Sequence, residues 1–186
     1  MNSKPKCIIV TGRQGSGKTT LARKLGTILR MPAILRDEVK EGYVNTFGVK
    51  HDELPHDSNR IVTDLFFHLV EEYLSGNVSV VIEAAFQHRV WEPRLEGVRE
   101  LADIRMVLCK IDDDVAFRRP IDRGLADPER EFYHGDNRVV HFKNTGEIVM
   151  PAPYEAPRFD VPTIEVRTDK GYAPTLDEIV MFVRSA

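Results

Sequence analysis

The chain has 186 residues, of which 42% are hydrophobic and 30% are charged, and its formal net charge is -3. This composition is typical of a soluble globular protein, and we expect one domain over residues 1–186. The acidic balance argues against a stable nucleic-acid partner, and no apolar run approaches the roughly 20 residues of a membrane-spanning helix. Cys7 and Cys109 lie in apolar runs, and no leader is apparent, so we expect reduced thiols and a cytoplasmic location.

Short apolar runs alternate with segments of helical periodicity along the whole chain. In chain order, the predicted elements are strand Cys7–Thr11, helix Lys18–Leu29, strand Pro32–Leu35, helix Arg36–Tyr43, helix Arg60–Leu74, strand Val78–Ile82, helix Trp91–Ala102, strand Ile104–Ile111, helix Asp113–Gly124, strand Thr163–Thr168 and helix Leu176–Ser185. Loops are expected at Asp52–Asn59 and across Leu125–Pro157, where polar residues, glycines and prolines interrupt the periodicity. Strands that alternate with helices indicate βαβ units and a parallel sheet covered on both faces.

A complete phosphate-binding motif, G-x-x-x-x-G-K-[ST], lies between the first strand and the first helix, which is the context that the motif requires. Its residues are Gly12, Arg13, Gln14, Gly15, Ser16, Gly17, Lys18 and Thr19, and the adjacent Thr20 is added to the nucleotide-binding residues. Glycines let backbone N–H groups point at phosphate oxygens, and the helix N-terminus adds a positive end. Lys18 can reach the β- and γ-phosphates, and Thr19 can bind Mg²⁺. The motif therefore predicts binding of ATP with Mg²⁺.

Other classes of P-loop protein carry motifs that this sequence lacks. A GTPase would carry N-K-x-D and D-x-x-G, and a transporter ATPase would carry L-S-G-G-Q, of which only the first three residues occur, at Leu74, Ser75 and Gly76. The chain is also short for an oligomeric motor ATPase. The kinase branch remains, whose members are compact and carry an arginine-rich lid.

The P-loop, together with Leu35–Gly42 (L-R-D-E-V-K-E-G), resembles an AAA_33-like group of ATP-binding predicted kinases, which is related to polynucleotide 5′-kinases, chloramphenicol phosphotransferases and zeta-toxin kinases. The resemblance extends from Ile8 to Phe182. It implies a doubly wound α/β fold of the P-loop NTPase type, with a five-stranded parallel sheet in the order 2-3-1-4-5 and a mobile lid at about residues 118–150. It also implies transfer of the γ-phosphoryl group from ATP to a hydroxyl of a small-molecule or nucleotide-type acceptor.

Asp37 matches the position at which these families place the residue that accepts the proton of the acceptor hydroxyl. A carboxylate beside the hydroxyl can orient it for attack on the γ-phosphorus and remove its proton. Asp37 could instead cap the helix that follows. Arg36 and Lys40 flank it, and each could bind an anionic acceptor or lie in solvent.

Further charged residues are candidates for the phosphate site. Glu83 follows the third predicted strand and could hold Mg²⁺ through water or position the acceptor, although Asp is the more usual residue there. Arg119 and Arg123 are four residues apart and would share one helix face. The resemblance implies that such lid arginines close onto the transferring phosphoryl group, while the alternative is a solvated basic face. Pro120 between them predicts a kink or an end of the helix.

Thr168 and Asp169 follow the last strand, in a loop that touches adenine in the families that the chain resembles; a plain turn is the alternative. Two functions compete with a small-molecule kinase. One is a polynucleotide 5′-hydroxyl kinase, which the acidic net charge disfavours. The other is an ATP-binding regulatory protein with slow ATPase activity, which would need neither Asp37 nor an acceptor pocket.

Overall fold

A five-stranded sheet forms the centre of the computed structural model, which describes residues 4–135, 137–150 and 153–185. The strands are β1 (Lys6–Gly12), β2 (Ala33–Leu35), β3 (Val80–Ala84), β4 (Asp103–Lys110) and β5 (Thr163–Arg167). All pairs are parallel and the order is β2-β3-β1-β4-β5, which confirms the predicted P-loop NTPase fold. In the central strand, Val10 pairs with Glu83 on one side and Val107 on the other.

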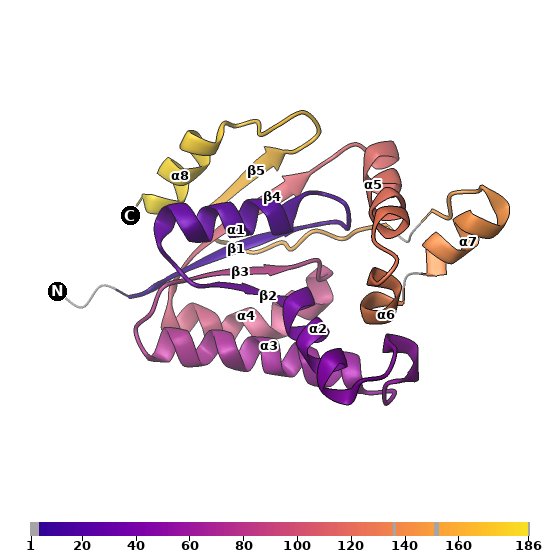
Figure 1. Cartoon of the computed structure of the whole chain (residues 1–186). Helices are drawn as coiled ribbons and strands as arrows, with labels where there is room; N and C mark the ends of the chain where they lie inside the picture. The colour runs from indigo at the N-terminus through magenta and orange to yellow at the C-terminus, as the bar shows by residue number, and fades with distance from the viewer. Residues whose placement is uncertain (1–3, 136, 151–152, 186) are drawn as a thin grey trace.

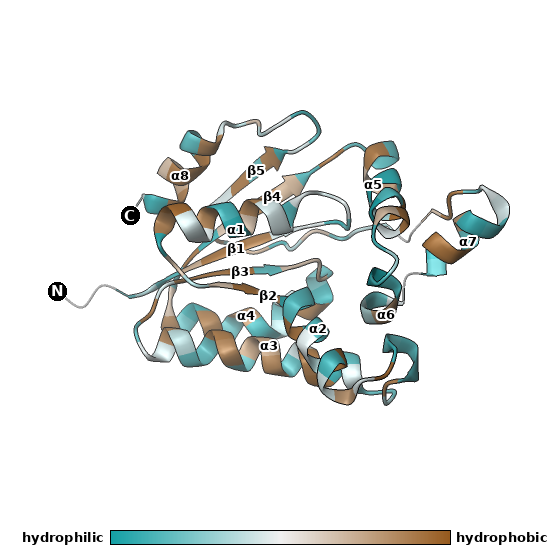
Figure 2. Ribbon diagram, viewed as in Figure 1, coloured by the Kyte–Doolittle hydropathy of each residue, from teal (hydrophilic) through white to brown (hydrophobic). Residues whose placement is uncertain are grey.

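Helices cover both faces of the sheet (Figure 1). They are α1 (Lys18–Leu29), α2 (Arg36–Phe47), α3 (Ser58–Ser75), α4 (His88–Leu101), α5 (Asp113–Ala126), α6 (Arg130–His134), α7 (Asn137–Thr145) and α8 (Leu176–Arg184), with a 3-10 turn η1 (His51–Glu53). The layer with α3 and α4 contains the buried Phe66, Phe67 and Trp91, and the layer with α1 and α8 contains Leu21 and Ile179. The apolar residues of these helices therefore pack against the sheet. Figure 2 shows hydrophilic and hydrophobic residues alternating along the helices.

Packing at the carboxyl end of β3 fixes one wall of the region where ligands bind in such sheets. Phe86 follows β3 and stacks on Phe67, with ring centroids 5.8 Å apart, and meets Trp91 edge to face at 5.3 Å. Phe66 and Phe67 are themselves in edge contact at 5.2 Å. This aromatic cluster holds the start of α4 against α3.

The prediction of a loop over Leu125–Pro157 is wrong in its first half, which contains α6 and α7. Val139 of α7 is buried, and a Cβ atom at Gly124 of α5 would lie only 2.6 Å from its Cγ2 atom. The helix α7 therefore depends on close packing against α5, and α6 lies against α2 and η1. Such contacts produce no long apolar repeat in the sequence. Residues 136, 151 and 152 of the predicted loop lie outside the described residues.

Pro120 does not end its helix, because α5 continues to Ala126, and a kink there stays a prediction. Proline has no N–H group and leaves the carbonyl of the residue four positions earlier without its helical partner. That carbonyl belongs to Ala116 and lies against the P-loop, where a Cβ atom at Gly15 would be 2.4 Å from it.

The other predicted elements differ from the structure by a few residues at their ends. The predicted loop at Asp52–Asn59 contains part of η1 and the first residues of α3. Cys7 and Cys109 are both buried free thiols, as predicted. None of the helices in the described ranges is long and apolar enough to cross a membrane.

Candidate functional site

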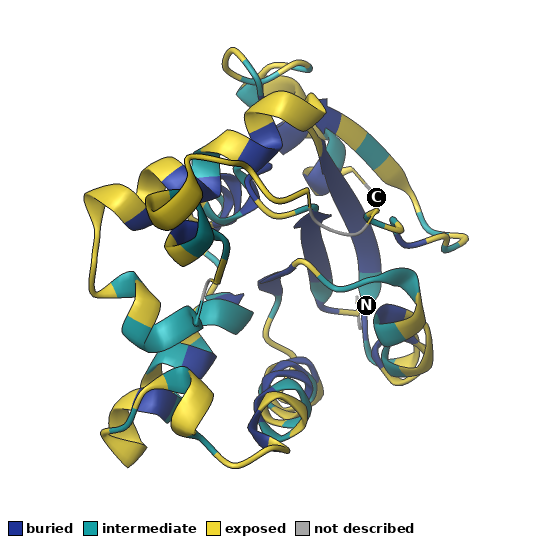
Figure 3. Ribbon diagram, turned by 90° about the vertical axis from the view of Figure 1, so that its right-hand side faces the viewer, coloured by how far each residue is buried: buried dark blue, intermediate teal, exposed yellow. Residues whose placement is uncertain are grey.

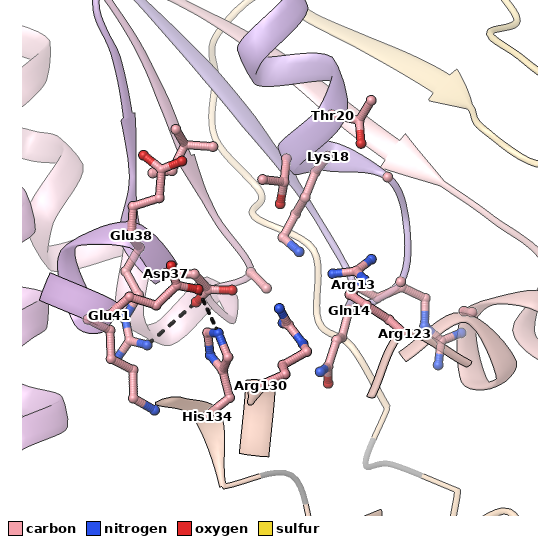
Figure 4. Close-up of a pocket in the computed structure, with 18 of the residues that line it drawn as sticks. Arg13, Gln14, Lys18, Thr20, Asp37, Glu38, Glu41, Arg123, Arg130 and His134 are labelled. Atoms are coloured by element: carbon pink, nitrogen blue, oxygen red, sulfur yellow. Dashed lines mark hydrogen bonds and ion pairs between the residues drawn. The ribbon is translucent and has the colours of Figure 1, made fainter. Parts of the chain in front are cut away.

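A cavity of about 780 Å³ opens at the carboxyl ends of the strands, between the P-loop, α2, α5 and α6. Figure 3, viewed from the side of α5, α6 and α7, shows buried inner strands and helices with many exposed residues around them. The side chains that line the cavity come from all these elements, and Lys18 points into it (Figure 4). Such a volume suits a small-molecule ligand.

The P-loop is so closely packed that two of its glycines cannot be replaced without clashes. A Cβ atom at Gly12, where φ is +152°, would lie 2.5 Å from the carbonyl oxygen of Cys109. At Gly15 φ is +81°, a left-handed conformation that side chains rarely adopt. The loop therefore lies between β4 and α5, as a phosphate-binding turn at a helix N-terminus requires.

Glu83 lies beside the P-loop at the end of β3, and its side chain is 3% exposed. Thr19 donates a hydrogen bond from Oγ1 to its Oε2 atom at 3.0 Å, and the Nζ atom of Lys18 lies 3.6 Å from Oε1. Burial raises the pKa of the Glu83 carboxyl, and the charge of Lys18 opposes that shift. The structure thus brings together the three P-loop and strand residues that the sequence singled out.

Oxygen atoms of Thr19 and Glu83 are the kind of ligand that Mg²⁺ prefers. Within the described part of the chain, no group of three or more His, Cys, Asp and Glu side chains is placed to bind a metal ion. A magnesium ion at this place would therefore need phosphate oxygens and water to complete its shell, which is how Mg²⁺ binds in many phosphoryl-transfer sites.

Asp37 lies in the first turn of α2 and lines the same cavity as Lys18. The residue at the helix start is Leu35, and no side-chain hydrogen bond caps that described end. Burial alone would raise the pKa of Asp37, but nearby basic residues hold that pKa below its usual range; these are Lys18, His134, Arg36 and Arg130. The carboxyl is therefore ionised at neutral pH and faces positive charge across the cavity.

The two predicted lid arginines occupy different places. Arg123 lines the cavity, whereas Arg119 donates hydrogen bonds to three backbone carbonyls, of Gly15 at 3.3 Å, Thr168 at 3.1 Å and Asp169 at 3.3 Å. Thr168 also donates from Oγ1 to the carbonyl of Ser16 at 2.8 Å. The loop after β5 is thereby attached to the P-loop, next to the predicted phosphate site.

Several cavity residues were not found by the sequence reasoning. Arg130 and His134 belong to α6, in the segment that is predicted as a loop, and Tyr154 also lines the cavity. The Oη atom of Tyr154 lies 3.1 Å from Oγ1 of Thr11. The basic and aromatic residues of E-R-E-F-Y-H were a weak signal for α6, but Tyr154 stands in a segment without periodicity.

Comparisons with known proteins agree with this geometry. A family model described as an AAA domain, AAA_33, matches residues 7–138, more than half of the chain. No curated protein sequence matches. Among solved structures, a candidate kinase from Chloroflexus aurantiacus is 22% identical, with a TM-score of 0.78 and 98% of each chain covered.

Two further structures are similar over nearly their whole length. The APS kinase CysC of Mycobacterium tuberculosis, solved in complex with AMPPNP and APS, is 16% identical, with a TM-score of 0.62 over 98% of this chain and 99% of that one. A gluconokinase from Sinorhizobium meliloti is 16% identical, with a TM-score of 0.56 over 98% of this chain and 93% of that one. At these identities the likeness shows a shared fold.

Proposed function

The chain belongs to the AAA domain family AAA_33, a P-loop kinase-like family, and we propose that it is an ATP-dependent kinase acting on a hydroxyl of a small-molecule or nucleotide-type acceptor. One observation carries this proposal: the P-loop lysine, Lys18, and the ionised carboxylate, Asp37, line one cavity from two different elements. A protein that only bound or slowly hydrolysed ATP would have no need of a carboxylate there. The complex of the similar APS kinase with AMPPNP supports nucleotide binding in this fold.

The P-loop would bind the phosphates of ATP through the backbone of Gly12–Thr20, with Lys18 at the β- and γ-phosphates. Thr19, assisted by Glu83, would hold Mg²⁺, which when bound neutralises charge on the phosphates. Thr168 and Asp169 would lie beside the adenine, as the family resemblance implies, and the hydrogen bond from Thr168 to Ser16 holds their loop next to the P-loop.

Asp37 would accept the proton of the acceptor hydroxyl as its oxygen forms a bond to the γ-phosphorus. The bond between that phosphorus and the β,γ-bridging oxygen breaks, and ADP leaves. Arg123 and Arg130 line the cavity and would stabilise the negative oxygens of the transferring group. Arg119 would position the P-loop by donating a hydrogen bond to the carbonyl of Gly15.

The experiment that tests this function measures ADP release with a panel of alcohol acceptors, including sugars, nucleosides and 5′-hydroxyl oligonucleotides. We expect release to rise with one class of acceptor, and to give one phosphorylated acceptor for each ADP. A slow rate that no acceptor changes would instead support a nucleotide-binding regulatory protein. Phosphorylation of oligonucleotides alone would identify a polynucleotide kinase.

A further inference from the structure

The acceptor side of the cavity contains more positive charge than its carboxylates balance. Arg36 and Lys40 are four residues apart on α2, so they lie on the same face one turn apart. Arg130 lines the same cavity from α6. The side chain of Arg36 is 15% exposed and Lys40 is 7% exposed. Buried cations are costly to a fold unless they are paired, so their partners are informative.

The partner of Lys40 is a neutral group. Its Nζ atom lies 3.3 Å from Nε2 of His51, and Nδ1 of His51 is buried without a hydrogen-bond partner among the described residues. Burial and the charge of Lys40 lower the pKa of His51, so the imidazole is uncharged at neutral pH. His51 can therefore orient the ammonium group by accepting a hydrogen bond, yet it leaves the positive charge available. In the described ranges, no carboxylate lies within ion-pair distance of Lys40.

Arg36 is likewise incompletely balanced. Its Nη2 atom donates to the amide oxygen of Asn59 at 3.1 Å, and its Nε atom is buried without a described partner. Its closest carboxylate contact is Asp37, at 3.7 Å from Nη1. The two other carboxylates of α2 that line the cavity have partners of their own: Glu41 contacts Nε2 of His134 at 2.8 Å, and Glu38 forms an ion pair with Arg23. These contacts leave the positive charges of Arg36, Lys40 and Arg130 near Asp37, in addition to that of Lys18.

We propose that the acceptor is an alcohol that also carries an oxyanion, a phosphate or carboxylate group, and that Arg36, Lys40 and Arg130 bind this group while the hydroxyl lies at Asp37. This inference rests on the proposed kinase function and specifies its substrate class. The cations are on the elements that flank Asp37, α2 and α6, rather than on the P-loop. Arginine matches planar or tetrahedral oxyanions in a bidentate manner, and lysine adds a point charge. His51 acts as a positioning residue for Lys40.

The test compares matched acceptors in which one neutral group is replaced by an anionic one, such as sorbitol, gluconate and sorbitol 6-phosphate, or adenosine and AMP. The protein should phosphorylate anionic members and ignore the neutral ones, and the preferred anion distinguishes phosphate from carboxylate. In Lys40→Met, we expect the KM for the anionic acceptor to rise about 10- to 100-fold, with a nearly unchanged KM for ATP. Lys40→Arg should retain most of the affinity, and Lys50→Met, at an exposed lysine outside the cavity, should match the wild type.

A binding measurement separates this inference from the kinase proposal. Inorganic phosphate, titrated calorimetrically into protein saturated with AMPPNP, should bind the wild type. Its affinity should fall about tenfold or more in Lys40→Met. Equal use of neutral and anionic acceptors, a raised KM for ATP in place of the acceptor, or phosphate binding that Lys40→Met leaves unchanged would each overturn the inference. Phosphorylation of neutral acceptors alone would do so while leaving the kinase proposal intact. Phosphate binding without any acceptor turnover would support the anion site and count against the kinase.

Discussion

Lys40→Met should stabilise the fold even though it weakens acceptor binding. Lys40 is 7% exposed, and burial, followed by repulsion from Arg36, lowers its pKa from 10.5 to about 8. Keeping Lys40 protonated in the folded state at pH 7 therefore lowers the free energy of unfolding by about 3 kcal/mol. Methionine has a similar length and no charge, and it gives up the hydrogen bond to His51, which contributes about 1 kcal/mol. A net gain of about 1–2 kcal/mol in the free energy of unfolding follows.

The lowered pKa of Lys40 also predicts how the stability of the protein changes with pH. Between about pH 8 and pH 10.5 the unfolded chain binds a proton at Lys40 that the folded chain does not, so this residue makes stability rise with pH. The groups around it are Arg36, Asp37 and Glu41 on its own helix, His51 on η1, and Arg130 and His134 on α6. The advantage of Lys40→Met over the wild type should therefore shrink between pH 7 and pH 10.

Urea unfolding of the wild type and of Lys40→Met, at pH 7 and at pH 10, measures both effects. Lys50→Met is the matched control, because that lysine is exposed and should change stability little at either pH. A Lys40→Met variant that is less stable than the wild type at pH 7 would show that the ammonium group stabilises the free protein. The unbalanced positive charge that we propose for binding the acceptor would then be absent from the protein.

Three other predictions concern the nucleotide, the base and the lid. Lys18→Ala should abolish phosphoryl transfer and weaken ATP binding, because a charge at the phosphates is lost; unchanged turnover would refute the P-loop assignment. Asp37→Asn should keep the affinity for ATP and lower the transfer rate at saturating ATP by roughly 10²–10⁴-fold, and near-normal transfer would move the search for the base to Glu83. Amide hydrogen exchange in α6 and α7 should slow when an ATP analogue binds, since Arg130 lines the cavity; equal exchange with and without the analogue would contradict a mobile lid.

The fold and the P-loop were predictable because their signals are local. The apolar runs and the helical periodicity identify the strands and helices, and the P-loop motif is contiguous in sequence. Asp37 and Glu83 are distant in sequence, but each follows a strand, and the carboxyl ends of parallel strands meet at one edge of the sheet. The strand order came from the family resemblance, since periodicity alone does not determine which strands are neighbours.

The acceptor side was less predictable because its properties depend on contacts between distant segments. Lys40 could be identified as a candidate, but its burial depends on the packing of η1 and α6 against α2. A Cβ atom at Gly135, for example, would lie 2.5 Å from Cδ2 of His51, and Tyr133 donates to Asn45 at 3.1 Å. No contiguous run of residues predicts such contacts, so the sequence analysis did not identify α6 or its Arg130.

The lid arginines show how one sequence pattern can divide into two roles. Arg119 and Arg123 share a face of α5, and the sequence treats them alike. Arg119 contacts three carbonyls that belong to the P-loop and to the loop after β5, which joins α5 to the nucleotide side of the site. Arg123, one turn further, lines the cavity. A helix fixed at one turn can present the next turn in a defined place, and this gives Arg123 a rigid support.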